Sequence, residues 1–217
     1  MSKKIIVSSM FYIFFILVGC TVFQPRYPVK IDHIPEPALP TPQSFRAEQE
    51  ILFSFDDRTM AGTGTLSLDR ATRSLELSCV TPEGKEFLHL RVKDEEPEIL
   101  FAVPFFKETA GLADAIAIDV FRIYFNNQPM NMDDVSRKGD TLLFDIDLVD
   151  RAMEYAYMGE PPVLASKRYC GLRGVEAKID YSDYIDQEGF GCIGTATLKN
   201  RLCGYQLVIR TKKITIK

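Results

Sequence analysis

The sequence has no tryptophan, two histidines and five cysteines among its 217 residues. It contains no His-Glu-x-x-His, Cys-x-x-Cys or Gly-x-Ser-x-Gly motif and no glycine-rich phosphate loop. His33 and His89 stand apart from any pattern of acid, base and nucleophile. We therefore expect no enzymatic activity, no metal and no cofactor, and we interpret both histidines as structural or solvated.

An excess of positive charge is also absent. Lys and Arg number 26 against 30 Asp and Glu, which gives a net charge of −4. A mildly acidic chain lacks the positive field that nucleic-acid binding requires, so we expect no nucleic-acid partner. The 46% hydrophobic and 26% charged residues are typical of a globular chain, and this length suits one sizeable domain. We expect that domain to be a monomer.

No apolar run is long enough to cross a bilayer comfortably, but a shorter one lies at the N-terminus. Lys3 and Lys4 precede an apolar stretch of fourteen residues, Ile5 to Val18. About 20 residues are needed to span a membrane, so this stretch fits a secretory signal better, and an uncleaved signal anchor is the alternative. Loss of residues 1–19 would remove two lysines and no acid, shifting the net charge from −4 to −6.

The signal ends in Leu17-Val18-Gly19-Cys20, which resembles the bacterial lipobox. The resemblance implies that Cys20 becomes the diacylated first residue of the mature chain. Thr21 follows in place of an Asp that would resemble an inner-membrane retention signal. The implied location is the outer membrane, with the chain lipid-anchored on the periplasmic face.

Residues 20–44 form a second segment, which begins with the lipidated cysteine and is rich in proline. Six of the chain's twelve prolines lie here, and no apolar periodicity is present. This composition predicts a semi-rigid tether of the polyproline type. The alternative is that its second half packs over the domain surface.

The third segment, residues 45–217, alternates between apolar and polar residues over short stretches separated by turn residues. A helical spacing of apolar residues predicts one principal helix over 107–126, and 150–158 suits a second, short helix. The charged run 93–98 is interpreted as a solvated loop. The expected strands are 45–56, 59–68, 74–80, 87–92, 141–148, 175–181, 190–198 and 205–216, the last with a bend near Lys212.

Together these segments predict a mostly β domain with one principal helix. A curved antiparallel sheet of roughly eight to eleven strands, apolar on one face, would wrap around that helix. The sheet would be an unclosed half-barrel.

Short motifs in this domain resemble the LolA/LolB-like superfamily, and LolB-like lipoproteins most closely. They are the second strand Met60–Leu68, the Thr81-Pro82-Glu83-Gly84 turn followed by Phe87–Leu90, and the ending Tyr205–Arg210. The resemblance implies an unclosed barrel whose hydrophobic cavity takes up lipoprotein acyl chains delivered by a soluble periplasmic carrier. It covers most of residues 45–217, although the C-terminal half matches by element order only.

The resemblance also suggests two sets of site residues. A membrane-facing turn would contain Glu83, where the family has an exposed leucine; a carboxylate does not enter hydrocarbon easily, so membrane delivery is in doubt. Apolar residues on the inward strand faces and on the helix are candidates for the cavity lining, and they fit a filled core equally well. They are Phe53, Phe55, Leu66, Leu68, Leu77, Leu90, Phe121 and Phe144.

Four cysteines remain besides Cys20, an even number that suits disulfides in an oxidising compartment. Our preferred pairing is Cys192–Cys203 with Cys79–Cys170, because Cys192 and Cys203 flank a predicted hairpin. Buried free thiols are the alternative.

The sequence thus favours an outer-membrane-anchored lipoprotein that binds acyl chains or lipoprotein cargo in a LolB-like manner. The alternative is a non-enzymatic envelope scaffold lipoprotein that docks a protein complex.

Overall fold

The computed structural model describes residues 25–31, 40–129, 134–147, 151–172 and 174–217. Within these residues, thirteen strands form one antiparallel sheet and two more form a small hairpin. The strands of the sheet are β1 (Tyr27–Pro28), β2 (Ser44–Phe55), β3 (Arg58–Asp69), β4 (Ser74–Val80), β5 (Glu86–Lys93), β6 (Glu96–Ala102), β7 (Val135–Lys138), β8 (Thr141–Asp147), β9 (Ala152–Met158), β10 (Val163–Gly171), β11 (Gly174–Ser182), β14 (Thr195–Asn200) and β15 (Tyr205–Ile216).

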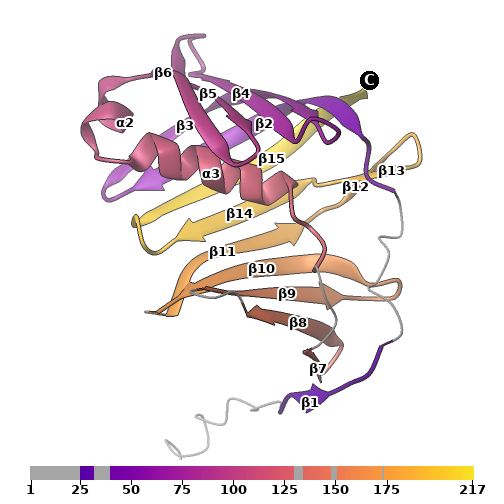
Figure 1. The fold of residues 1–217 in the computed structure, drawn as a ribbon. Helices are drawn as coiled ribbons and strands as arrows, with labels where there is room; N and C mark the ends of the chain where they lie inside the picture. Colours follow the sequence, from indigo (N-terminus) through magenta and orange to yellow (C-terminus); the bar gives the residue numbers. More distant parts are fainter. Residues whose placement is uncertain (1–24, 32–39, 130–133, 148–150, 173) are drawn as a thin grey trace, which may run out of the picture.

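The sheet runs in the order β1-β7-β8-β9-β10-β11-β14-β15-β2-β3-β4-β5-β6. Its edges, β1 and β6, are not paired with each other, so the described part of the sheet stays open. It curls around helix α3 (Leu112–Tyr124), with the shorter helix α2 (Pro104–Glu108) beside it (Figure 1). This is the unclosed, mostly β half-barrel with one principal helix that the sequence predicts.

Alternation of side chains explains why this sheet has one dry face. In β2, Phe45, Ala47, Ile51 and Phe53 are buried while their neighbours face solvent. The buried face of α3, which includes Ile116, packs onto the same core. Among the described residues, no helix is long and apolar enough to cross a membrane.

A buried carboxylate on helix α3 helps to fix the helix to the sheet. Asp119, on the helix, accepts hydrogen bonds from Asn200 Nδ2 at 2.7 Å and from the Tyr205 hydroxyl at 2.6 Å. It also accepts one from Arg122 Nη1 at 2.9 Å. Because Asn200 ends β14 and Tyr205 begins β15, Asp119 connects the helix to both strands.

Several predicted boundaries differ from the structure. The helix expected over 107–126 is divided into α2 and α3 by Gly111, whose φ of +71° suits glycine. The strand expected over 190–198 is two strands, β13 (Phe190–Cys192) and β14. A Cβ on Gly194, between them, would lie 1.5 Å from the Asp183 carbonyl oxygen, so the chain turns there against a close neighbour. The bend predicted near Lys212 is confirmed by a register shift between Thr211 and Lys213.

The short helix predicted over 150–158 is wrong, because the segment is strand β9. Tyr155 and Tyr157 lie on its buried inner face, and β8 and β10 pair with it on both sides. Aromatic residues favour such a pleated, packed position. The estimate of eight to eleven strands was also low, since the predicted strands omitted β1, β6, β7 and β10 and the prediction assigned β9 to a helix.

The proline-rich segment is not wholly a free tether. Tyr27 and Pro28 pair with Arg137 and Ser136 of β7, and Val29 N–H donates to the Val135 carbonyl at 3.0 Å. Arg26 forms ion pairs with Asp145 at 3.2 Å and Glu154 at 2.5 Å. These contacts attach residues 26–29 to the far edge of the sheet, which corrects the tether predicted over 20–44. The described end of the segment, from residue 40 on, packs on the domain as the alternative predicted: the Pro40 carbonyl accepts from Gly191 N–H at 2.9 Å and the Pro42 carbonyl accepts from Arg70 Nε at 3.2 Å. Residues 1–24 and 32–39 lie outside the described residues.

Candidate functional site

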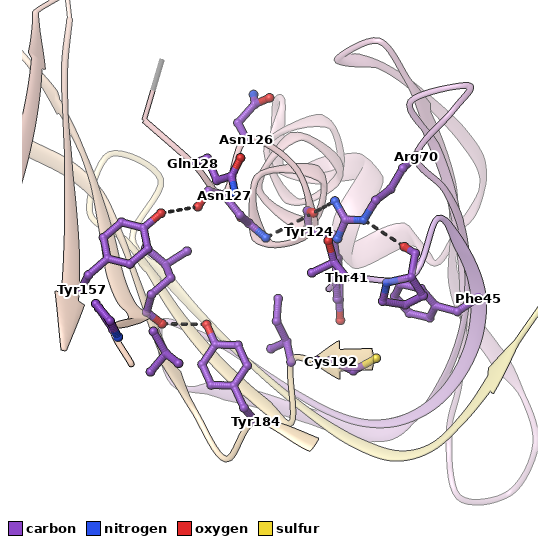
Figure 2. Close-up of a pocket in the computed structure, with 16 residues that line it drawn as sticks. Thr41, Phe45, Arg70, Tyr124, Asn126, Asn127, Gln128, Tyr157, Tyr184 and Cys192 are labelled. Atoms are coloured by element: carbon purple, nitrogen blue, oxygen red, sulfur yellow. Dashed lines mark hydrogen bonds between the residues drawn. The ribbon is translucent and has the colours of Figure 1, made fainter. Parts of the chain in front are cut away.

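A cavity of about 370 Å³ lies at the open end of the half-barrel, where α3 ends. Such a volume is in the range typical of small-molecule binding sites. Figure 2 shows that its walls come from separate parts of the chain: the start of β2, the end of α3, β9 and the β13 region. The apolar wall residues are Pro42, Phe45, Pro162, Val163, Leu164, Cys192 and Ile193.

Three tyrosines add aromatic surface to this wall. The Tyr157 hydroxyl donates to the Asn127 carbonyl at 2.8 Å, and the Tyr184 hydroxyl donates to the Leu164 carbonyl at 2.6 Å (Figure 2). The Tyr124 hydroxyl accepts from Gln49 Nε2 at 2.6 Å. Burial raises the pKa of all three phenols, so they stay neutral at physiological pH. Their hydroxyls are engaged with the protein, which leaves the ring surfaces for an apolar ligand.

The rim of the cavity is polar, with Asn126, Asn127, Gln128 and one charged residue, Arg70. The Arg70 guanidinium donates to the Pro42 carbonyl at 3.2 Å and the Tyr124 carbonyl at 3.0 Å (Figure 2). Burial lowers the pKa of Arg70, which nevertheless remains charged. Of the described lining residues, Arg70 alone carries a charge. The cavity is therefore an apolar chamber with a single cation at its rim.

Lys167, on β10, supports this rim from the inside. Its side chain is wholly buried, and its ammonium donates to the carbonyl of Arg122, to that of Phe125 at 3.0 Å and to Asn127 Oδ1 at 2.8 Å. These oxygens lie at the C-terminal end of α3, where helix carbonyls lack partners and a cation is favoured. Lys167 thus fixes both the end of the helix and Asn127 on the rim.

The eight residues predicted to line a cavity lie elsewhere. All belong to the hydrophobic core or pack against it, and none lines this cavity. The inward faces of the strands are filled by α3 and α2: Phe53, for example, stacks edge-on against Phe106 of α2, with 5.2 Å between ring centroids. The domain therefore has both a filled core and, beyond the end of α3, an open chamber.

Sequence reasoning missed the chamber because its walls are assembled from turns and strand ends. Arg70 follows β3, Asn127 follows α3 and Tyr184 lies between β11 and β12 (Ile185–Gln187). Alternation identifies which strand residues face inward, but it does not identify loops that meet in space. The nearest sequence signal is the run Asn126-Asn127-Gln128-Pro129, which is typical of the end of a helix and does not by itself indicate a cavity.

The turn containing Glu83 forms as expected between β4 and β5. Gly84 N–H donates to the Thr81 carbonyl at 2.8 Å, and Glu83 is fully exposed. A hydrogen bond from the Thr81 side chain lowers the pKa of Glu83, which favours its charged form.

His89, on β5, lies on the outer surface, with its Nε2 at 2.9 Å from the Glu76 carboxylate and its Nδ1 at 3.3 Å from the Glu86 carboxylate. Cys20 and His33 lie outside the described residues.

The predicted disulfides are wrong in the structure, where Cys79, Cys170, Cys192 and Cys203 are free thiols. Cys79 is on β4 and Cys170 on β10, six places apart in the sheet order, or about 29 Å at strand spacing. Cys192 and Cys203 lie beyond opposite ends of β14, whose six residues span about 20 Å. A disulfide needs Cα atoms within about 7 Å, so neither pair can form without rearrangement.

Among the described residues, no cluster of three His, Cys, Asp or Glu side chains could hold a metal ion.

An open antiparallel sheet curled around one helix, with a chamber at one end, defines the structural class of this protein. The same fold occurs in a LolA superfamily protein from Nitrosomonas europaea, with a TM-score of 0.55 and 10% identity over 82% of this chain and 89% of that one. A DUF1329 family protein from Desulfovibrio piger is similar too, with a TM-score of 0.50 and 8% identity over 82% and 87% of the two chains. No protein-family model and no curated protein matches the sequence. The chain has the LolA-like fold.

Proposed function

We propose that this protein is a lipid-anchored lipoprotein of the bacterial outer membrane that binds acyl chains, or the acyl chains of lipoprotein cargo, in the chamber beyond α3. The observation that carries the proposal is the chamber itself, which is apolar inside and polar at its rim. The LolA-like fold supports it, because a protein of that superfamily shares this architecture. The lipobox-like sequence before Cys20 supports the anchor and the periplasmic location.

The chamber suits an amphipathic ligand for a physical reason. Moving several hundred Å² of acyl-chain surface out of water yields several kcal/mol at about 25 cal/mol per Å². After the entropy costs of binding, this is enough for reversible holding without covalent chemistry. Arg70 lies where the polar end of such a ligand would emerge, and its positive charge would favour a carboxylate or phosphate there.

The proposed action is binding and transfer. It requires no cofactor and no catalysis, and the partners are the membrane, through lipid on Cys20, and the cargo or a soluble periplasmic carrier that delivers it. Nucleic acid is not among the proposed partners, since the net charge of the chain is negative.

Lipid retention by protein lacking its own lipid tests this function. The Cys20→Ser chain, purified gently and extracted with organic solvent, should carry co-purified lipid detectable by mass spectrometry. A second variant, Ile193→Trp, adds a bulky ring to the chamber wall and should lose most of that lipid. Leu100→Trp, on the exposed edge strand β6, is the matched control and should retain it. Absence of lipid from all three proteins, or equal lipid in all three, would reject acyl-chain binding in the chamber.

A non-enzymatic envelope scaffold remains the second candidate, because β6 is an open edge with exposed apolar residues. Leu100 and Phe101 on this strand are each 39% exposed, and one side of the strand lacks a partner among the described residues. Open edges can pair with a strand from another protein. If the chamber carries no lipid, and a Leu100→Lys change releases a protein that otherwise co-purifies, the scaffold function is favoured.

A further inference from the structure

Two leucines are exposed at neighbouring hairpin tips. Leu172, in the turn between β10 and β11, is 97% exposed, and Leu202, in the turn between β14 and β15, is 69% exposed. Single exposed apolar residues are common on protein surfaces, but two leucines at adjacent tips form a paired apolar feature. None of the interactions of the fold or the chamber described above uses either side chain.

The two turns are joined through Glu176 of β11. Its carbonyl accepts from Arg201 N–H at 2.7 Å and from Leu202 N–H at 3.3 Å, and its carboxylate lies against Gly171, the last residue of β10 before the other turn. β11 pairs with both β10 and β14, and β15 follows β14, so the two hairpins are centred about 10 Å apart. We name Leu172 and Leu202 together the leucine tips.

The leucine tips lie at the end of the half-barrel opposite the chamber. Asn200 pairs with Tyr205 and Gly171 with Gly174 at this end, whereas the chamber residue Leu164 pairs with Tyr157 at the other. In Figure 1 both turns are at the left of the view, and α3 ends toward the right. A surface in contact with the leucine tips would therefore leave the chamber facing away.

The N-terminus of the described chain is attached near this same end. Arg26 is paired with Glu154, which is also paired with Arg168 at 2.9 Å. Arg168 is four residues before Leu172, or about 13 Å along the strand. Cys20 is six residues before Arg26, so a fully extended chain places it within about 22 Å of Arg26. A lipid on Cys20 would hold this end of the domain close to the bilayer.

The charges around the leucine tips favour contact with a lipid surface on one side of this end of the domain and oppose it on the other side. Lys199 and Arg201 precede Leu202 and are exposed, whereas the acid between the two turns, Glu176, is partly buried with its carboxylate against Gly171. Asp56 and Asp57, in the turn between β2 and β3, lie at the same end beside β15, and Glu83 lies further along the sheet. Cations next to apolar residues favour contact with phospholipid headgroups, while the acids favour water. The contact is thus confined to the β10–β15 side of this end.

We propose that the leucine tips insert into the membrane that holds the anchor, so that the domain stands with its chamber directed away from the bilayer. This inference rests on the proposed lipid anchor at Cys20. The partner is a phospholipid bilayer; a protein partner at the tips would be a different outcome of the test.

Because the chain has no tryptophan, one introduced tryptophan reports its own surroundings. Leu172→Trp and Leu202→Trp are made in the full chain, processed in a bacterial host and reconstituted in phosphatidylethanolamine–phosphatidylglycerol vesicles with brominated acyl chains. Both should shift their emission to the blue and lose about half of it to quenching. Met158→Trp, at a turn near the chamber and 47% exposed, is the matched control and should be neither shifted nor quenched.

A second measurement separates the tips from the anchor. The Cys20→Ser chain is floated with the same vesicles, and the Leu172→Ser and Leu202→Ser changes should together weaken its binding by about a hundredfold, tenfold for each leucine removed from lipid. Mass spectrometry of Cys20 reports the anchor independently. Loss of the lipid mass would overturn the anchor, whereas a lipidated protein with unquenched reporters at both tips would overturn this inference alone. Equal quenching at Met158→Trp would also overturn it.

Discussion

At the scale of single residues, Lys167 is the most unusual group in the structure. It is 0% exposed, and the oxygens that it contacts belong to two backbone carbonyls and one amide. Among the described residues, no carboxylate forms an ion pair with it. Burial, together with the nearby positive charges of Arg122 and Arg70, lowers the pKa of Lys167 well below its usual value. Its position at the end of a helix is what makes a buried amine tolerable.

This lowered pKa predicts a pH dependence of stability. Between the lowered pKa and about 10.4, the unfolded chain binds more protons at Lys167 than the folded one, so the free energy of unfolding rises with pH. Lys167→Met should remove that contribution, which is at most about 1.4 kcal/mol per pH unit. Urea unfolding at pH values from 7 to 10 measures it as a rise in the parent's free energy of unfolding relative to that of the variant. A pH-independent difference, or the same relative rise with the exposed Lys199→Met control, would contradict the prediction.

At the scale of elements, the position of α3 depends on polar contacts as well as apolar packing. Asp119 is 1% exposed and is fully surrounded by donors from the helix and from two strands. A buried carboxylate of this kind stabilises only while its partners are present, and its removal leaves buried donors unsatisfied. The contact therefore specifies where along the sheet the helix lies.

Removal of this contact should be costly. Asp119→Ala should lower the free energy of unfolding by about 3 kcal/mol, because Asn200 and Tyr205 lose a charged acceptor in a buried site. Asp114→Ala, on the exposed side of the same helix, should change it by less than about 1 kcal/mol. Urea denaturation of both variants provides the comparison. Similar losses for the two would show that Asp119 adds nothing beyond ordinary helix packing.

Elements were predictable from the sequence where one periodicity dominates. The alternation in β2 and in β4 and the helical stripe of α3 were identified because a dry face repeats there without interruption. β10 was missed because Ser166, Lys167 and Arg168 interrupt its apolar pattern, and β6 was missed because Glu96 and Glu98 lie on an exposed edge. β9 was assigned to the wrong class, since a short apolar segment fits either period and only its paired neighbours decide.

At the scale of the whole molecule, the width of the sheet separates the cysteines. Thirteen strands in one open sheet place β4 and β10 far apart, and β14 holds Cys192 and Cys203 at its two ends. Burial raises the pKa of the Cys79 thiol to about 12, which makes it unreactive in the folded state.

The oligomeric state is a separate question, and the expectation that the domain is a monomer stays a prediction.

A thiol titration tests this arrangement. Protein isolated without reductant and then unfolded in guanidinium should show four titratable thiols from Cys79, Cys170, Cys192 and Cys203. Before unfolding, Cys79 should react far more slowly than the partly exposed Cys170 and Cys203, because its thiolate is scarce and covered. Recovery of two thiols or none after unfolding would mean that disulfides form after all.

The sequence alone determined the class of the fold and the expectation of an anchor, because both depend on local patterns: a period of two, one helical stripe, and a charged, apolar and cysteine-ended N-terminus. The tertiary structure alone decided where the chamber lies, that Tyr27 and Pro28 join the sheet, and that the two exposed leucines lie side by side. Each of these depends on residues far apart in the chain, which come together when a twisted sheet of thirteen strands curls around a helix that is much shorter than the sheet is wide.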